Sequence, residues 1–264
     1  MNSNKPYHIG ITKEDIKNAK YAILPGDPGR VRLIASLMDN PVFLNQSREY
    51  TSYLAKTNNE YVLIISTGMG GPSAAICMEE LHQIGIENVI RVGTCGGMQK
   101  DIMAGDVVVA SAAIRAEGTS KEYLPIEYPA VSDFNITNTL RKSANDLNLK
   151  AYVGVVHSKD SFYGQHSPER MPVGYELQNK WGAFIKCGSL ASEMETAAIF
   201  SVASVLRMKA GSVLLVIWNQ ERNDNKECHD ELIPAKIAIK TINKLTKNKN
   251  WLMSVYFIFW TFHL

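Results

Sequence analysis

The sequence predicts an α/β protein built as a three-layer sandwich, with helices on both faces of one central sheet. Short apolar runs rich in valine, isoleucine and leucine alternate along the chain with stretches of helical periodicity. Such runs are typical of strands buried on both faces, and the segments between them are typical of the helices that cover a sheet. No internal repeat, low-complexity tract or linker interrupts the alternation. Residues 1–264 are therefore expected to form a single domain with a large core.

Each element is justified by its own residues. The runs expected to form strands are residues 21–24, 62–67, 88–92, 106–110 and 212–217. The segments expected to form helices are residues 72–84, 136–147, 196–206 and 231–245. The first helix begins with Pro72, which suits the first turn, and its Ile76, Leu81 and Ile84 fall on one side.

The tail at residues 249–264 departs from this pattern, because it is apolar and rich in aromatic residues. It is shorter than the roughly 20 residues that a transmembrane helix requires, so no spanning segment is expected. A packed terminal element, a subunit contact and a sequence that has drifted from its relatives all stay open. The residues assign the tail no function.

The bulk composition excludes several classes of partner. Lysine and arginine number 28 and aspartate and glutamate 26, and this balance gives no electrostatic reason to bind nucleic acid or an anionic membrane. The amino terminus lacks the basic and apolar regions of a secretory signal, so a cytoplasmic location is expected. The four cysteines lie far apart without a CxxC pair, so we expect reduced thiols and no metal site.

Two of the apolar runs end in glycine-rich turns that carry an arginine. Gly26 to Arg30 follow the run at 21–24, and Arg91 to Gly97 overlap the run at 88–92. Glycines let backbone N–H groups converge on an oxyanion, and a guanidinium adds two parallel donors. Farther along, Glu193-Met194-Glu195 supplies carboxylates that can accept from hydroxyl groups. The pattern predicts phosphate donors combined with sugar acceptors.

Five motifs stand in order along most of the chain: His8-Ile9-Gly10, Gly26-Asp27-Pro28-Gly29-Arg30-Val31, Ser66-Thr67-Gly68-Met69-Gly70-Gly71-Pro72-Ser73, Arg91-Val92-Gly93-Thr94 and Glu193-Met194-Glu195. Together they resemble the nucleoside phosphorylase family of the purine and uridine phosphorylase type. The resemblance implies a mixed sheet flanked by helices and a hexamer assembled from dimers. It also implies cleavage of a nucleoside by inorganic phosphate to a free base and ribose 1-phosphate. Phosphate is then a co-substrate, and no cofactor is expected.

The resemblance assigns the phosphate site. Gly26, Arg30, Arg91 and Thr94 match the family's phosphate-binding residues, and Arg48 matches the arginine that a neighbouring subunit contributes. Three guanidiniums suit a dianion, and catalysis of this reaction depends mainly on positioning and electrostatics. Without the other motifs, Arg48 would be interpreted as an exposed residue of an alternating strand.

The resemblance also assigns the ribose site. Glu195 matches the carboxylate that holds the 2′- and 3′-hydroxyls, with Met194 against the sugar and Glu193 and Thr94 close by. His8 matches the histidine that reaches the 5′-hydroxyl from the neighbouring subunit of a dimer. Arg91 and Glu195 are expected to be catalytic, since both act on the charged sugar and phosphate.

A structural explanation competes at the carboxylates. Glu193 and Glu195 precede the expected helix at 196–206, where negative charge is favourable, and Ser192 is a candidate cap. From the residues alone, capping is the first interpretation for Glu193 and sugar binding the first for Glu195.

Base recognition is expected from residues 160–170. In the family, a glutamine and a nearby arginine pair with the uracil edge and an aromatic ring stacks on the base, which points to Gln165, Arg170 and Phe162. Gln165 is the third expected catalytic residue. Four residues separate Gln165 from Arg170 where the common family spacing has one, so Arg222 is an alternative partner.

Four other functions fit the residues less well. A purine phosphorylase would carry a serine and an aspartate near Asn219 to protonate the purine, and this pair is absent there. A nucleoside hydrolase would need no clamp for a dianion. A dinucleotide-binding oxidoreductase is disfavoured because Gly68-Met69-Gly70-Gly71 lacks the full GxGxxG pattern. A non-catalytic binding protein would have no reason to combine phosphate, ribose and base elements.

Overall fold

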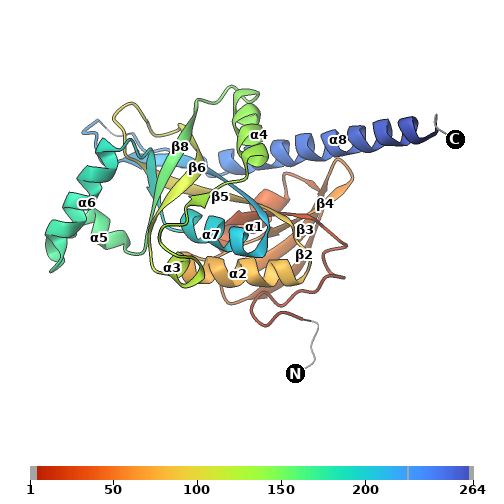
Figure 1. The fold of residues 1–264 in the computed structure, drawn as a ribbon, viewed down its shortest axis with the longest axis horizontal. Coiled ribbons are helices and arrows are strands. Elements are labelled where there is room, and N and C mark those ends of the chain that lie inside the picture. The colour runs from red at the N-terminus through yellow and green to blue at the C-terminus, as the bar shows by residue number, and fades with distance from the viewer. Residues whose placement is uncertain (1–4, 225, 262–264) are drawn as a thin grey trace.

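A ten-stranded mixed sheet forms the centre of the molecule (Figure 1). The computed structural model describes the backbone of residues 5–224 and 226–261, with side chains as far as residue 247. The strands are β1 Tyr21–Pro25, β2 Asp39–Ser47, β3 Tyr50–Thr57, β4 Glu60–Ile65, β5 Asn88–Gly97, β6 Val107–Ala116, β7 Ala130–Val131, β8 Ala151–Lys159, β9 Ala191–Glu193 and β10 Lys209–Asn219. Their order is β10-β6-β8-β9-β5-β1-β4-β3-β2, with β7 beside β6. A further pairing of β10 with β5 closes part of the sheet into a ring.

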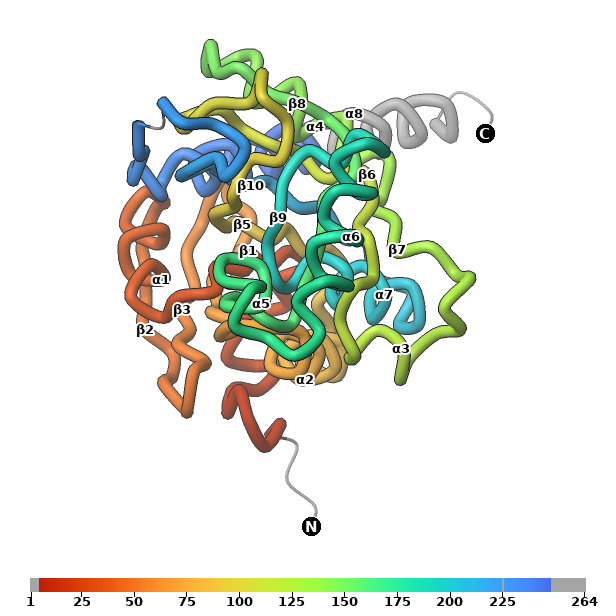
Figure 2. Tube along the Cα trace, turned by 90° about the vertical axis from the view of Figure 1, so that its left-hand side faces the viewer, coloured from red at the N-terminus to blue at the C-terminus, as the bar shows by residue number. Residues whose placement is uncertain are grey.

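Helices cover both faces of the sheet, as the predicted three-layer sandwich requires. They are α1 Pro28–Ala35, α2 Gly71–Gln83, α3 Thr119–Tyr123, α4 Phe134–Asn145, α5 Phe162–His166, α6 Gly174–Lys186, α7 Thr196–Leu206 and α8 Ile233–Thr261, with a 3₁₀ turn at Pro168–Arg170. Helices α2 and α7 pack on one face, and α1, α4 and α8 pack on the other. Helices α5 and α6 lie together at one end of the molecule (Figures 1 and 2).

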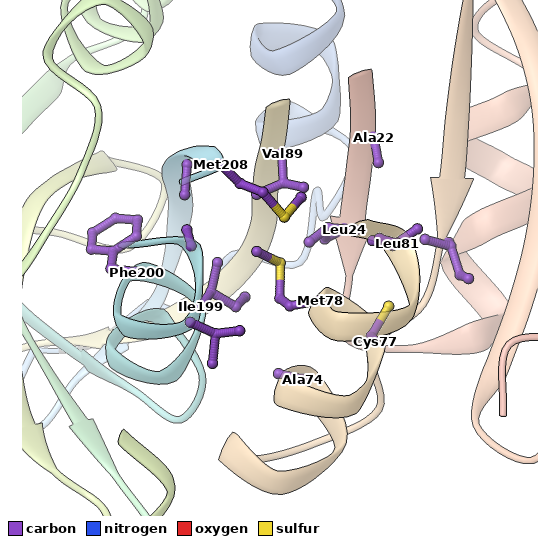
Figure 3. Packing of buried hydrophobic residues seen from close by; sticks show 14 of the residues in the cluster. Ala22, Leu24, Ala74, Cys77, Met78, Leu81, Val89, Ile199, Phe200 and Met208 are labelled. Carbon is purple, nitrogen blue, oxygen red and sulfur yellow. The ribbon is translucent and has the colours of Figure 1, made fainter. Parts of the chain in front are cut away.

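Alternate residues of β1 fill the two faces. Ala22 and Leu24 belong to the apolar cluster under α2 and α7, whereas Ile23 belongs to the cluster under α1, α4 and α8. Figure 3 shows Met78 of α2 between Leu24 and Ile199 of α7. Burial on both faces is the reason that this run is apolar throughout.

The predicted elements are present, with some ends displaced. Helix α7 has the expected bounds, and α8 begins at Ile233 instead of residue 231. Strand β4 ends at Ile65 instead of residue 67, because the N–H of Thr67 donates to the carbonyl of Pro25 across the next turn. The elements β2, β3, β7, β8, β9, α1, α3, α5 and α6 were not predicted.

Two expectations concern the tail and the cysteines. No helix in the described part of the chain is both long and apolar enough to cross a membrane. The side chains of the tail at residues 249–264 lie outside the described residues. All four cysteines are unpaired thiols.

Candidate active site

A cavity of about 560 Å³ lies where the carboxyl ends of β1, β5 and β10 meet the segments that follow β4, β8 and β9. Strand β9 joins the ends of β5 and β8, because Gly96 pairs with Ser192 and Ser192 pairs with His157. Most of the expected site residues line the cavity: Gly26, Arg30, Arg91, Thr94, Phe162, Gln165, Glu193, Met194 and Glu195. Segments far apart in the sequence therefore converge on one site.

Two glycine turns form one wall of the cavity. The N–H of Gly68 donates to the carbonyl of Gly26 at 3.0 Å, so the turn after β4 lies directly against the turn after β1. A side chain on Gly68 would come within 2.8 Å of Glu49, and its φ of +71° favours glycine. The glycines thus allow the close approach of two backbones beside the turn at Gly26, which the sequence predicted to bind an anion.

Arg30 enters the cavity from the first turn of α1. Asp27 begins this helix by accepting a hydrogen bond from the Gly29 N–H at 2.8 Å. The Nε atom of Arg30 lies 2.6 Å from a carboxylate oxygen of Glu231, and the side chain is 17% exposed. Glu231 had no sequence signal, because it lies two hundred residues away in the segment before α8. It holds the arginine in position at the cavity wall.

Arg91 is buried between two carboxylates. Its Nε donates to Glu193 at 3.0 Å, and its Nη2 forms a short ion pair with Glu195. Its Nη1 is buried without a hydrogen-bond partner among the described residues. A side chain at Gly93 would come within 2.9 Å of Nη2, so glycine is needed for the guanidinium to pass. Although burial opposes the charge, the two glutamates raise the pKa of Arg91 above its ordinary value.

Glu193 stabilises the start of helix α7, as the capping interpretation expected, although the N-cap position itself is Glu195. Its carboxylate accepts from the N–H groups of Glu195 and Thr196 at 2.9 Å, and from the hydroxyl of Ser158. Burial would raise the pKa of Glu193, but Arg91 and these donors bring it below its usual range. Ser192 as the cap is wrong, because this residue lies in β9 and its hydroxyl donates to Gln165.

Glu195 lies between Arg91 and the glycine turn that contains Gly70. One carboxylate oxygen pairs with Arg91, and the other accepts from the Gly70 N–H at 2.6 Å. Burial raises the pKa of Glu195, and neighbouring Glu193 raises it further while Arg91 opposes both effects. This carboxylate is fixed on two sides and faces the cavity, as an acceptor for a sugar hydroxyl should.

Gln165 lies at the other end of the cavity and is held on both sides of its amide. Its oxygen accepts from Ser192 at 2.6 Å, and its nitrogen donates to the side-chain oxygen of Gln220 at 3.1 Å. Gln220 follows Asn219 directly in sequence, and its side-chain amide orients Gln165 here. Phe162 lines the same end and is 51% exposed, which leaves a ring face for stacking.

The two arginines considered for the base do not line this cavity. Arg170 is exposed, and its guanidinium lies 5.9 Å from the centre of the Tyr163 ring. Arg222 binds both carboxylate oxygens of Asp224 and also donates to the carbonyl of Lys100. The cation at this end is instead Lys159, the last residue of β8, which lies one residue before the segment 160–170 expected to recognise the base.

His8 and Arg48 also lie outside the cavity, and both lie beside Tyr7. His8 is held by Glu80, whose carboxylate lies 2.7 Å from its Nδ1 and accepts from its N–H. The Tyr7 ring lies edge-on to His8 and 5.9 Å from the guanidinium of Arg48. Arg48 lies in the turn between β2 and β3 with a φ of +54°, so its interpretation as a strand residue is wrong.

The comparisons with known proteins agree with this geometry. The sequence profile of the phosphorylase superfamily matches residues 20–244. A uridine phosphorylase of Treponema pallidum is 49% identical over 243 residues, which cover 90% of this chain and 93% of that protein. The uridine phosphorylase of Haemophilus influenzae is 39% identical and covers 89% of this chain and 91% of its own. That of Escherichia coli is 38% identical and covers 93% of this chain and 100% of its own.

Proposed function

The chain belongs to the phosphorylase superfamily, and from this premise we propose that it is a pentosyltransferase that cleaves uridine with inorganic phosphate. The products are uracil and ribose 1-phosphate. The observation that carries the proposal is the position of Arg91, which two buried carboxylates hold in a cavity that reaches Gln165. This cavity offers donors for an anion, acceptors for hydroxyl groups and an amide for a base within one enclosure.

Phosphate is assigned to the arginine end. Arg30 and Arg91 supply guanidinium groups, and Gly26 and Thr94 supply an N–H and a hydroxyl from the turns beside them. The Nη1 of Arg91 has no hydrogen-bond partner in the described part of the chain, which supports this assignment, since a buried donor without a partner is costly and an anion would satisfy it. The nucleophile would thus be oriented by groups that are already held in place.

Ribose is assigned to the carboxylate between the two ends. Glu195 would accept from the 2′- and 3′-hydroxyls, and its negative charge would stabilise the positive charge that builds on the sugar as the bond to the base breaks. Met194 lines the same wall and would pack against the sugar. Glu193 acts through Arg91 and the start of α7, so it is assigned a positioning role.

Uracil is assigned to the end formed by Gln165 and Phe162. An amide can donate to a uracil oxygen and accept from N3–H, and a ring face can stack on the base. The purine alternative is not favoured. The acid nearest to Asn219 in sequence is Glu221, which accepts from the Trp181 indole at 2.8 Å in a neighbouring cavity of about 680 Å³.

The site is completed by a second subunit in this proposal. His8 and Arg48 both lie beside Tyr7, outside the cavity of their own chain, which supports their assignment to a neighbour's ribose and phosphate. A dimer with shared sites follows, and a hexamer of three such dimers is the proposed assembly. A cytoplasmic location and a reaction without any cofactor other than the phosphate co-substrate are part of the same proposal.

The direct test is the release of uracil from uridine, followed by absorbance, with and without phosphate. Phosphorolysis requires release that depends on phosphate and an equimolar yield of ribose 1-phosphate. Release in phosphate-free buffer would instead identify a hydrolase. Inosine as a parallel substrate separates the uridine assignment from the purine alternative.

A further inference from the structure

Lys159 is a buried cation at the base end that none of the assigned roles uses. It is 8% exposed and lines the cavity together with Phe162 and Gln165. Its ammonium donates to the hydroxyl of Ser192 at 3.0 Å, and that hydroxyl donates to the oxygen of Gln165 at 2.6 Å. The ammonium also lies 5.9 Å from the centre of the Phe162 ring. The charge therefore stands between the two residues assigned to the base.

We propose that Lys159 contacts the uracil ring and stabilises the negative charge that the base acquires as it leaves. This inference rests on the proposed function and gives that reaction a leaving-group residue. The lysine takes the role for which the sequence suggested an arginine. Arg170 and Arg222 both have their guanidinium groups engaged outside this cavity.

The surroundings of Lys159 favour a ligand over a purely structural ion pair. Among the described residues, its ammonium has no carboxylate within ion-pair distance, and Glu193 and Glu195 are both engaged with Arg91. An ammonium has three N–H donors, and the contact with Ser192 uses one of them. A charge buried with one neutral partner is unfavourable unless a bound group completes its hydrogen bonds. A ring oxygen of uracil is such a group.

The electrostatic environment is consistent with this role. Burial lowers the pKa of Lys159, while the negative charges of Glu193 and Glu195 act in the opposite direction. The two histidines near it, His157 on β8 and His166 on α5, both have lowered pKa values, first through burial and then through the lysine itself. With both rings shifted toward the neutral form, Lys159 is the candidate positive charge at this end of the cavity.

The step balances without any additional reactant. A phosphate oxygen forms a bond to C1′, the bond from C1′ to N1 breaks, and its electron pair remains on uracil, shared with the ring oxygens. Lys159 faces this charge through a hydrogen bond. Uracil leaves as the neutral base after it takes up one proton, and the HPO₄²⁻ group releases one proton when it becomes the dianion of ribose 1-phosphate.

The test compares two substrates whose bases differ in acidity. 5-Fluorouracil is a stronger acid than uracil, so 5-fluorouridine depends less on help for its leaving group. We expect Lys159→Met to lower kcat for uridine by about 10²-fold or more, by analogy with removal of one oxyanion donor. We expect a clearly smaller loss with 5-fluorouridine and partial recovery in Lys159→Arg. The matched control is Lys180→Met on α6, which removes an exposed lysine and should leave both rates unchanged.

Equal losses for both substrates, or a loss confined to the KM for phosphate, would overturn the inference and leave uridine phosphorolysis intact. Failure of the wild-type protein to release uracil with phosphate would overturn the function and this inference with it. A second measurement does not depend on folded variants. The wild-type protein should bind 5-fluorouracil with a lowered pKa, seen as absorbance of the anion at lower pH than in solution. An unshifted titration of bound 5-fluorouracil would contradict the role of Lys159.

Discussion

The Nε–H group of Arg91 donates a 3.0 Å hydrogen bond to the carboxylate of Glu193. The same carboxylate accepts from the Thr196 N–H at the first turn of α7. One side chain therefore connects the proposed phosphate-binding arginine to the start of a buried helix. The orientation of the guanidinium and the stability of the core are coupled through this contact.

Glu193→Gln should show that coupling. The substitution keeps the shape of the side chain but removes the charge that faces Arg91, so we expect a loss of about 1–3 kcal/mol in the free energy of unfolding. We also expect a higher KM for phosphate, because the arginine loses one of its two anchors. Thermal unfolding and phosphate titrations measure the two effects. Exposed Glu176→Gln is the control, and an unchanged phosphate KM would contradict the positioning role.

Arg30→Ala and Arg91→Ala should differ in stability although both impair phosphorolysis. Each removes an anion contact, and a loss of about 10²–10³-fold in activity is expected by analogy with an oxyanion donor. Arg91→Ala also leaves two buried carboxylates without their counter-ion, which should cost about 3–5 kcal/mol of stability. Arg30→Ala removes the cation only from the more exposed carboxylates of Glu231 and Asp27.

Unfolding curves and rates at limiting phosphate test this pair of variants. Exposed Arg141→Ala is the control for loss of a surface guanidinium. If a variant keeps near-normal activity at limiting phosphate, the altered arginine does not belong to the phosphate site.

The local chemistry of the turns was readable from sequence, whereas their distant partners were not. Gly26 and Gly93 stand directly after or within apolar runs, so the anion turns and their strands could be predicted together. Glu231 gave no signal, because its contact with Arg30 depends on where α8 begins in space. The wrong assignment of Ser192 as a cap has a similar cause, since the sequence does not show that β9 precedes α7.

Lys159 was missed for a related reason. Gly154 interrupts the apolar run of strand β8, and the strand ends in the polar residues His157, Ser158 and Lys159, so its sequence did not mark it as a strand that reaches the cavity. Without that strand, its last residue could not be placed at the cavity. Arg170 was expected at the base but lies exposed outside the cavity. It ends the 3₁₀ turn at Pro168–Arg170, which the sequence did not predict.

Mixed subunits should test the shared site. An Arg48→Ala protein and an Arg30→Ala protein are each expected to be nearly inactive. After subunit exchange, a mixed dimer would keep one site with both arginines intact. Recovery of about a quarter of wild-type activity is expected, since random exchange makes half of the dimers mixed and restores one of their two sites. Mass spectrometry confirms that the subunits have exchanged. If activity does not recover after exchange, Arg48 lies outside the neighbour's site.

His157 should make the protein less stable in acid. Burial and Lys159 lower the pKa of His157 to about 4, against an ordinary value near 6.5. The folded state therefore keeps the ring neutral while the unfolded state takes up a proton, so stability falls as the pH decreases from about 6.5 to about 4. The loss can reach about 3 kcal/mol, because one pKa unit corresponds to about 1.4 kcal/mol.

Urea unfolding across this pH range measures the effect of His157. In His157→Gln, the free energy of unfolding should no longer fall between pH 6.5 and pH 4 by the amount that this ring contributes. Exposed His229→Gln serves as the control, because it removes a histidine that pairs with Glu227 at the surface. If the free energy of unfolding of His157→Gln depends on pH as steeply as that of the wild type, His157 is not the source of the acid sensitivity.

Base recognition is expected to depend on Gln165 and, less strongly, on Gln220. Gln165→Ala removes the amide that would pair with uracil, and about 10²-fold or more should be lost in kcat/KM for uridine, because buried polar groups are left unpaired. Gln220→Ala removes only the residue that orients this amide, so a smaller loss, mainly in KM, is expected. Exposed Gln83→Ala should change neither value. All three variants should remain nearly inactive toward inosine, and a wild-type preference for inosine would show that Gln165 and Phe162 do not form a uracil site.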